Sequence, residues 1–365
     1  MTVDGSDDRG QGDVVETSVL IVGGGLTGLA IATALQEERR PFVLVDGRDR
    51  WGGRIHRARV DGSDFDLGPA WFWPGQPRMR ALAEQFGLTV FSQHSEGVDL
   101  FEDAAGHLHR NAGYASMAGS LRIDGGFMAL VDAMVAALPP ERLHLLHAVK
   151  TLAHTDSGVR ARVLAPEGPL SIDAERVIVA APPRLVAHSI ALDGVSTPEQ
   201  RETMAAIPTW MAGHAKIVAV YDHAPWRAAG FSGDVLSQRG PLVEIHDASP
   251  RNMQSFALFG FVGVPAGQRG TPAALLDSAR AQLERTFGRA AGQPKAMRLQ
   301  DWAAEPFTAT PRDAVMLRHH PAYGLPAALR ELGRGRVSLV CTETAPAHGG
   351  FLEGALEAAA DVIRT

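Results

Sequence analysis

Residues 17–46 read TSVLIVGGGLTGLAIATALQEERRPFVLVD, and this stretch decides the fold. The apolar run 17–22 is typical of a strand buried in a parallel sheet. The Ala- and Leu-rich stretch 26–38 has helical character, and 41–46 is a second short apolar strand. Strand, glycine turn, helix and strand in such close succession predict a βαβ unit at the start of the ordered chain.

The glycine turn of this unit has the spacing GxGxxG. Gly23 allows a tight turn, Gly25 lets the backbone approach a pyrophosphate, and Gly28 lets the helix pack closely on the strand. The helix that follows offers free N–H groups and the positive end of its dipole to phosphates. Asp46 ends the second strand, where a carboxylate bonds the hydroxyl groups of a ribose. This context favours a dinucleotide site over a glycine-rich turn without a ligand.

Composition narrows the class of protein. The 365 residues are enough for two domains with a substantial core. Hydrophobic residues make up 45% and charged residues 21%, which is typical of a soluble protein. The net charge of −6 argues against a nucleic-acid footprint or a polybasic membrane patch. We also find no apolar run as long as a membrane span.

The N-terminus and the cysteine content bear on the compartment. Residues 1–16 are acidic and glycine-rich and lack an apolar segment, so we interpret them as a disordered lead-in rather than a signal peptide. Cys341 is the single cysteine, which argues against an intrachain disulfide framework and fits a reducing compartment. We therefore expect a cytoplasmic protein.

Further elements follow from the apolar pattern. We predict buried strands at 176–183 and 337–342, and strands of an antiparallel sheet at 216–221 and 254–262. We also predict a helix that begins at a proline at 271–287 and an Ala- and Leu-rich terminal helix at 352–363. Segments rich in Trp, His and Pro separate the nucleotide-binding segments along the chain. We predict a discontinuous nucleotide-binding domain from 17–73, 121–190 and 335–365, and a substrate domain from 74–120 and 191–334.

Six blocks resemble the flavin-containing amine oxidase superfamily, which includes monoamine oxidases, polyamine oxidases and L-amino-acid oxidases. They are VLIVGGGLTGL (19–29), LVDGRDRWGGR (44–54), DLGPAW (66–71), LRIDGGFMALVDAM (121–134), VIVAAPP (177–183) and TETAPAHGGFLEGALEAA (342–359). The resemblance spans nearly the whole ordered chain and points to a short, bacterial-type, monoamine oxidase-like form. It implies an α/β fold, with an FAD-binding Rossmann-like domain of the glutathione reductase and amine oxidase type and an inserted α+β substrate domain.

The resemblance also implies which residues hold FAD. Asp46 matches the family's ribose acid, Glu343 the carboxylate that bonds the ribityl chain, and Leu352 the backbone N–H at the flavin O2 position. Val149 matches the backbone that contacts adenine. The full cofactor-binding set is Gly23, Gly25, Leu26, Thr27, Gly28, Asp46, Arg48, Gly53, Arg54, Gly68, Pro69, Ala70, Trp71, Val149, Glu343 and Leu352.

Lys216 is the predicted catalytic lysine. The segment HAKIVAVYDHAPWRAAGFSG (214–233) resembles the amine oxidase strand whose lysine holds a water over flavin N5. A lysine buried there loses charge by desolvation and orders that water for flavin reoxidation. The alternative is an exposed lysine at the start of a strand. The matching Tyr221 and Trp226 favour the functional interpretation.

The chain departs from the family pattern at several positions. The block 302–311 lacks the cysteine through which monoamine oxidases attach their flavin, so we expect non-covalent FAD, with Cys341 as a packing residue. Phe351 stands where the second tyrosine of the aromatic cage is found, and His348 where a tryptophan is common; we predict that both line the catalytic site. Only 49 residues, 72–120, separate the DLGPAW block from LRIDGG, so part of the substrate-side wall is expected to be missing.

The expected reaction is oxidation of the C–N bond of an amine to an imine, with O2 as acceptor and H2O2 as product. Two alternatives stay open: C–C desaturation or dehydrogenation on this scaffold, as in protoporphyrinogen oxidases or carotenoid desaturases, and a flavoprotein that is a non-catalytic partner subunit. An acceptor other than O2 is a further option. We expect no nucleic-acid or membrane partner, and a homodimer is a candidate assembly. We expect no metal, because the histidine pairs 144/147 and 319/320 lack ligands at metal-binding spacing.

Overall fold

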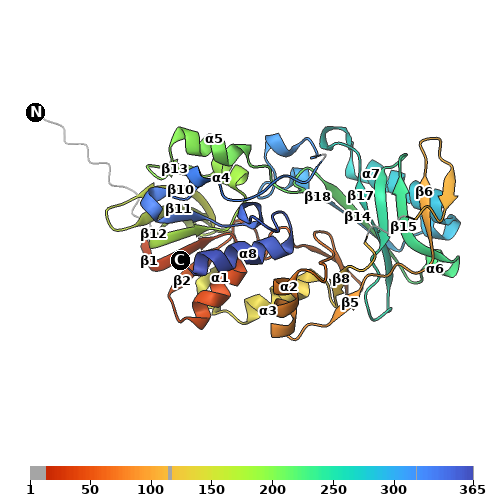
Figure 1. Ribbon diagram of the computed structural model, residues 1–365, viewed down its shortest axis with the longest axis horizontal. Helices are drawn as coiled ribbons and strands as arrows, with labels where there is room; N and C mark the ends of the chain where they lie inside the picture. The colour runs from red at the N-terminus through yellow and green to blue at the C-terminus, as the bar shows by residue number, and fades with distance from the viewer. Residues whose placement is uncertain (1–13, 114–116, 318, 365) are drawn as a thin grey trace, which may run out of the picture.

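The computed structural model describes residues 14–113, 117–317 and 319–364. Figure 1 shows two lobes, each built on a β-sheet, with the terminal helix α8 (Leu352–Ile363) lying beside α1 (Leu26–Glu37) in the first lobe. Within the described residues, the first sheet has eight strands. They are β13 (Ala191–Asp193), β10 (Ala148–His154), β11 (Val159–Ala165), β12 (Gly168–Val179), β1 (Val14–Val22), β2 (Phe42–Val45) and β9 (Leu143–His144) in spatial order, and β19 (Val337–Leu339) beside β12.

The predicted βαβ unit is confirmed. Strand β1 runs parallel to both β2 and β12, and α1 connects β1 to β2. The side chains of β1 alternate between two cores, because a central parallel strand is buried on both faces. Val19 and Ile21 belong to one cluster, and Leu20 and Val22 belong to the other.

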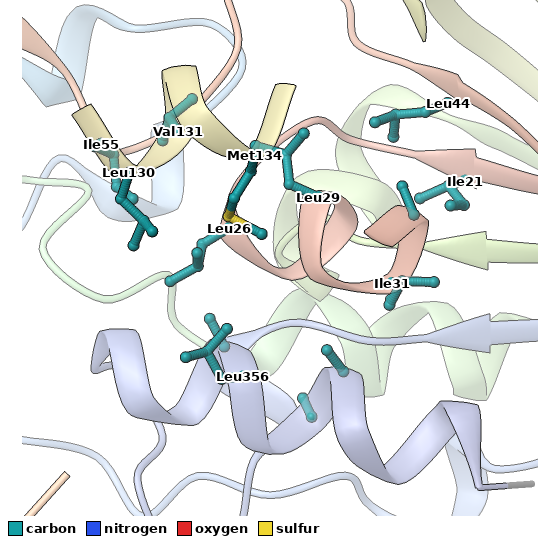
Figure 2. Packing of buried hydrophobic residues seen from close by; sticks show 14 of the residues in the cluster. Ile21, Leu26, Leu29, Ile31, Leu44, Ile55, Leu130, Val131, Met134 and Leu356 are labelled. Carbon is teal, nitrogen blue, oxygen red and sulfur yellow. The ribbon is translucent and has the colours of Figure 1, made fainter. Parts of the chain in front are cut away.

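Helices cover the first of these faces. Helix α1 packs there with α3 (Phe127–Ala136) and α8, and α2 (Pro77–Gln85) packs against α8. Figure 2 shows side chains of this core converging, with Leu29 of α1, Met134 of α3 and Leu356 of α8 all buried. The core on the opposite face contains side chains of β10 and β11, two further strands of the same sheet, together with side chains of α4 (Pro183–Ser189) and α5 (Pro198–Ala206).

The second sheet has seven strands among the described residues. Its order is β18 (Ala296–Asp301), β14 (Ala215–Tyr221), β17 (Phe256–Val262), β16 (Leu242–Asp247), β15 (Phe231–Ser237), β6 (Val98–Glu102) and β7 (Leu108–Arg110). Neighbouring strands are antiparallel except β15 and β6. Helix α7 (Pro272–Phe287) covers one face, and the hairpin β3 (Arg57–Val60)–β4 (Ser63–Asp66) packs on the other. All seven residues of β14 are therefore buried.

The remaining elements are short. Strands β5 (Val90–Ser92) and β8 (Leu121–Ile123) form a two-stranded sheet, and α6 (Pro225–Ala228) follows β14. The α/β fold class and the main predicted strands and helices are confirmed. Within the described parts of the chain, no helix combines the length and apolar character needed to cross a bilayer.

Several predicted boundaries were wrong. Residues 14–16 belong to β1 rather than to the lead-in, because they pair with residues 171–173 of β12; residues 1–13 lie outside the described residues. The substrate domain was predicted to begin at 191, but β13 pairs with β10 and Met204 of α5 lies in the core of the first lobe. Its other predicted segment, 74–120, includes α2, which also packs in the first lobe.

Candidate functional site

One cavity of about 910 Å³ is lined by residues from both lobes. The glycine turn after β1 and the start of α8 come from the first lobe, and β14, β16 and β17 come from the second. The cavity brings together most of the predicted site residues: Gly23, Gly25, Leu26, Thr27, Asp46, Arg48, Gly53, Arg54, Gly68, Pro69, Ala70, Trp71, Lys216, Phe351 and Leu352.

The glycines of the turn have distinct roles. A Cβ on Gly28 would lie 1.9 Å from the carbonyl oxygen of Gly23, so this position must be glycine for the helix to pack on the strand end. Gly28 does not line the cavity. A Cβ on Gly25 would meet no atom closer than 3.9 Å, and Gly25 faces the cavity. Open space at this glycine fits a ligand that approaches the backbone.

Asp46 fixes two backbone turns at the dinucleotide end of the cavity. Its buried carboxylate accepts the N–H of Gly24 at 2.7 Å and that of Arg48 at 2.8 Å. The Arg48 guanidinium donates to Thr308 Oγ1 at 2.8 Å, and its Nε lies 3.5 Å from Glu305 Oε1. That buried Nε has no hydrogen-bond partner in the described chain. A buried guanidinium on the cavity wall with spare donor capacity fits a phosphate ligand.

Arg54 and Glu343 form a bidentate ion pair beside the cavity. The two nitrogen–oxygen distances are 2.5 and 3.0 Å, and Glu343 also accepts the N–H of Trp210 at 3.1 Å. Burial alone would raise the pKa of Glu343, but Arg54 outweighs burial and lowers it. Glu343 is therefore held as a carboxylate, with Arg54 between it and the cavity. Its contact with the ribityl chain stays a prediction.

Lys216 is buried in an aromatic box. Its Nζ donates to the carbonyl oxygen of Gly68 at 2.9 Å and lies 3.8 Å from the centroid of the Phe259 ring. Trp71 and Phe261 are the next rings, at 5.8 and 5.7 Å. Burial lowers the pKa of Lys216 to about 7, opposed in part by Asp66. The alternative of an exposed lysine is wrong, because the side chain is 2% exposed and faces the cavity.

Aromatic side chains surround Phe351. Its ring stacks on His320 with a centroid distance of 5.2 Å and an interplanar angle of 15°, and it meets the Trp73 ring edge-on at 6.1 Å. His320 also packs against Trp210 at 4.6 Å. No local pattern in the sequence indicates this cluster, because its members come from segments far apart in the chain. His320 belongs to the pair 319/320, for which the sequence analysis weighed only a metal-binding role.

Besides Gly28 and Glu343, two more predicted residues do not line the cavity. The imidazole and the backbone N–H of His348 both bond the Glu357 carboxylate, at 3.2 and 3.0 Å. These bonds hold His348 against α8, and it is not among the cavity-lining residues, so its catalytic role stays a prediction. Val149 is buried in the first-lobe core and does not line the cavity. It lies two residues after His147, whose N–H donates to the carbonyl of Asp46 at 2.9 Å, so an adenine contact nearby stays a prediction.

Glu244 is a cavity residue that sequence reasoning missed. The signal was the alternation in strand β16, LVEIHD, which puts Glu244 and His246 on the same face of the sheet. Within the described residues, no group of three or more His, Cys, Asp or Glu side chains is arranged to hold a metal ion.

With this geometry established, the family follows from comparison with known proteins. A model of the flavin containing amine oxidoreductase family matches residues 89–363. The chain belongs to this family. A model of the NAD(P)-binding Rossmann-like domain matches residues 21–86, which contain the glycine turn and Asp46. This flavin-dependent oxidoreductase therefore uses FAD, and the glycine turn and the Arg48 guanidinium fit that cofactor.

Related sequences carry consistent names. The chain is 23% identical to a probable flavin-containing monoamine oxidase A of Dictyostelium discoideum, over 93% of this chain and 95% of the relative. It is 26% identical to a putative flavin-containing monoamine oxidase of Mycobacterium tuberculosis, over 93% and 94% of the two chains. The first alignment covers 440 positions although this chain has only 365 residues, so at least 75 positions are absent here. The prediction of a shortened chain agrees with this difference.

Solved structures share the fold. A putrescine oxidase double mutant from a cofactor-binding redesign superposes with a TM-score of 0.78 at 20% identity, covering 97% of this chain and all of the other. Cyclohexylamine oxidase from Brevibacterium oxydans gives 0.77 at 17% identity, over 94% and 97% of the two chains. A putative protoporphyrinogen oxidase from an Exiguobacterium species gives 0.70 at 15%, over 95% and 98%.

Proposed function

We propose that this protein oxidises the C–N bond of an amine to an imine, with O2 as the electron acceptor and H2O2 as the second product. The observation that carries the proposal is Lys216, buried in an aromatic box on the wall of the cavity that also contains the dinucleotide turn. When bound, FAD would supply the hydride acceptor and the two-electron reductant for O2. The imine then hydrolyses in water.

The chain's own residues contribute orientation and a dry environment. Trp71, Phe261 and Phe351 line the cavity and keep water from the substrate amine, which must be neutral to give up a hydride. Lys216 is fixed by the Gly68 carbonyl, so a cation or an ordered water is held at one place. Such a site needs no catalytic triad.

The retention of FAD is proposed to be non-covalent. Residues 302–311 contain no cysteine, and Cys341 is the single cysteine of the chain. Cys341 is buried on the cavity wall, and burial raises the pKa of its thiol well above the usual value, which disfavours the reactive thiolate. FAD should be released into the supernatant when the holoenzyme is precipitated with acid.

Carbon–carbon desaturation is the second candidate, and the likeness to a putative protoporphyrinogen oxidase concerns the fold alone. A non-catalytic flavoprotein is the third. A buried lysine beside an aromatic-walled cavity favours the amine oxidase, because a cation at this place stabilises negative charge that develops on reduction of O2.

The test is anaerobic mixing of the FAD-loaded protein with a panel of primary, secondary and aromatic amines. Loss of flavin absorbance near its visible maximum, followed by H2O2 release on admission of O2, supports the proposal. Reduction by amines without H2O2 release indicates a dehydrogenase with another acceptor. If no amine bleaches the flavin, amine oxidation is excluded and the desaturase or non-catalytic functions take its place.

A further inference from the structure

A histidine lies on the cavity wall beside Lys216. His214 comes directly before the first printed residue of β14, and its carbonyl oxygen accepts the N–H of Trp302 at 3.0 Å, which continues the ladder with β18 by one residue. Side chains two residues apart on an extended strand point to the same side, with their α-carbons about 7 Å apart. Both His214 and Lys216 line the cavity. The imidazole is therefore placed to meet a molecule whose reacting end lies near Lys216.

The backbone that carries His214 is fixed by hydrogen bonds. Its own N–H donates to the carbonyl oxygen of Met211 at 3.0 Å. The buried guanidinium of Arg269 donates through Nη2 to the carbonyl oxygen of Gly213, the preceding residue, at 2.5 Å. Arg269 also forms an ion pair with Asp301 at the end of β18. These bonds fix the point from which the imidazole extends, and they place a cation close to it.

The imidazole of His214 is neutral at pH 7. Burial and the nearby Arg269 cation lower the pKa of His214 below its ordinary value, and the Met211 carbonyl opposes them only in part. Nδ1 is enclosed and has no hydrogen-bond partner among the described residues. A ligand in the cavity therefore reaches the ring at its Nε2 edge. A neutral imidazole has one nitrogen that accepts a hydrogen bond, whereas the ammonium group of Lys216 can only donate.

An acceptor at this place suits the chemistry of an amine that gives up a hydride. The nitrogen lone pair of the amine must stay free for that reaction, but its N–H groups can donate. Two neighbouring cations, Arg269 and the ammonium form of Lys216, disfavour a protonated amine here. An acceptor that binds an N–H fixes the direction of the lone pair without occupying it.

We propose that His214 binds the neutral form of the substrate amine, with Nε2 as the acceptor of an amine N–H, so that the enzyme prefers primary and secondary amines to tertiary amines. The inference rests on the proposed amine oxidation and names the residue that selects the class of amine. A tertiary amine has no N–H to donate. It would displace water from the imidazole without replacing the hydrogen bond, and that loss weakens its binding.

The experiment compares benzylamine, N-methylbenzylamine and N,N-dimethylbenzylamine in the FAD-loaded enzyme. We expect a higher kcat/KM for the two amines that carry an N–H. In His214→Phe, which keeps a ring and removes the acceptor, that preference over the tertiary amine should fall about threefold to tenfold, as for a lost neutral hydrogen bond. His214→Gln offers an amide oxygen and should keep most of the preference. The matched control is His223→Phe, the same change at an exposed histidine beyond the other end of β14, which should leave the preference unchanged.

Binding is measured separately by calorimetry on the anaerobically reduced holoenzyme, which cannot turn over, with each dissociation constant expressed for the neutral fraction of the amine. Tighter binding of the N–H amines that is lost in His214→Phe supports the hydrogen bond even if no amine is oxidised, so the two proposals fail separately. If His214→Phe does not fold, His214→Leu takes its place in both measurements. Equal binding of the three amines by the wild type, or equal weakening of all three in the variant, would overturn the proposal.

Discussion

The ammonium group of Lys216 is buried among three aromatic rings and has one carbonyl acceptor. We predict that Lys216→Met slows reoxidation of the reduced enzyme by O2 more than it slows reduction by substrate. Methionine keeps the length of the side chain and removes the charge that stabilises an anionic oxygen species. Stopped-flow absorbance measures the two half-reactions separately. Equal slowing of both would mean that the lysine mainly shapes the cavity.

The pH dependence of reoxidation is a second expectation at this residue. Because burial lowers the pKa of Lys216 to about 7, the side chain is charged below neutral pH and loses its proton as the pH rises through 7. The reoxidation rate constant of the wild type should therefore fall between about pH 6 and pH 8, and that step should be absent in Lys216→Met. A wild-type rate that is flat across this range, or the same step in both proteins, would contradict the assignment.

Asp46 is predicted to govern FAD retention. Asp46→Ala removes the charge-assisted bonds expected to the ribose, which are worth about 1.5–3 kcal/mol, or roughly tenfold to a hundredfold in the dissociation constant. The same change leaves the N–H groups of Gly24 and Arg48 without their acceptor, so the apoprotein should also lose stability. FAD titration monitored by fluorescence gives the first quantity and thermal unfolding of the apoprotein the second. An unchanged dissociation constant would show that the ribose is held elsewhere.

Single residues differ in how well the sequence predicts them. Gly25, Asp46 and Lys216 lie at the cavity as predicted, since each is part of a local pattern whose chemistry depends on its immediate neighbours. The environment of His348 was not predictable, because nothing local indicates that Glu357 of α8 binds its imidazole. Glu244 was missed as a cavity residue, because its position depends on pairing with a strand that comes later in the chain.

At the scale of elements, the turn between β1 and α1 makes a sharp prediction about two glycines. Gly28→Ala should destabilise the apoprotein severely, because the new Cβ would overlap the Gly23 carbonyl. Gly25→Ala should leave the thermal stability of the apoprotein nearly unchanged. The backbone of Gly25 is extended, as any residue allows, and a Cβ at this position would enter open space. It should nevertheless weaken FAD binding, since its methyl group enters the space for the pyrophosphate. Similar apoprotein melting temperatures for the two variants would refute this division of roles.

The elements themselves were predictable where their signal is local. The βαβ unit, α7 and α8 show hydrophobic patterns and start signals within one segment. The structure places their ends within a residue or two of the prediction, except that β1 begins three residues earlier. The pairing of strands that are far apart in the chain cannot be recognised from a pattern within either strand. Strand β6 joins the second sheet beside β15, across about 130 residues of chain, and β13 joins the first sheet after the predicted end of that domain. These non-local pairings explain the misplaced domain boundaries.

At the scale of the whole molecule, the cavity wall is shared by both lobes, so FAD bound there should stabilise the entire chain against unfolding. A ligand that binds the folded state alone adds about 2.7 kcal/mol at a free concentration of 100 times its dissociation constant. For a chain of this length we expect the melting temperature to rise by about 3–5 °C, and to continue rising with the logarithm of FAD concentration. Differential scanning fluorimetry of the apoprotein across a series of FAD concentrations measures the shift. Gly25→Ala is the matched control, because this variant should keep the fold while its added methyl group blocks the cofactor site. A shift of equal size in that variant would mean that FAD stabilises the protein from some place other than the glycine turn.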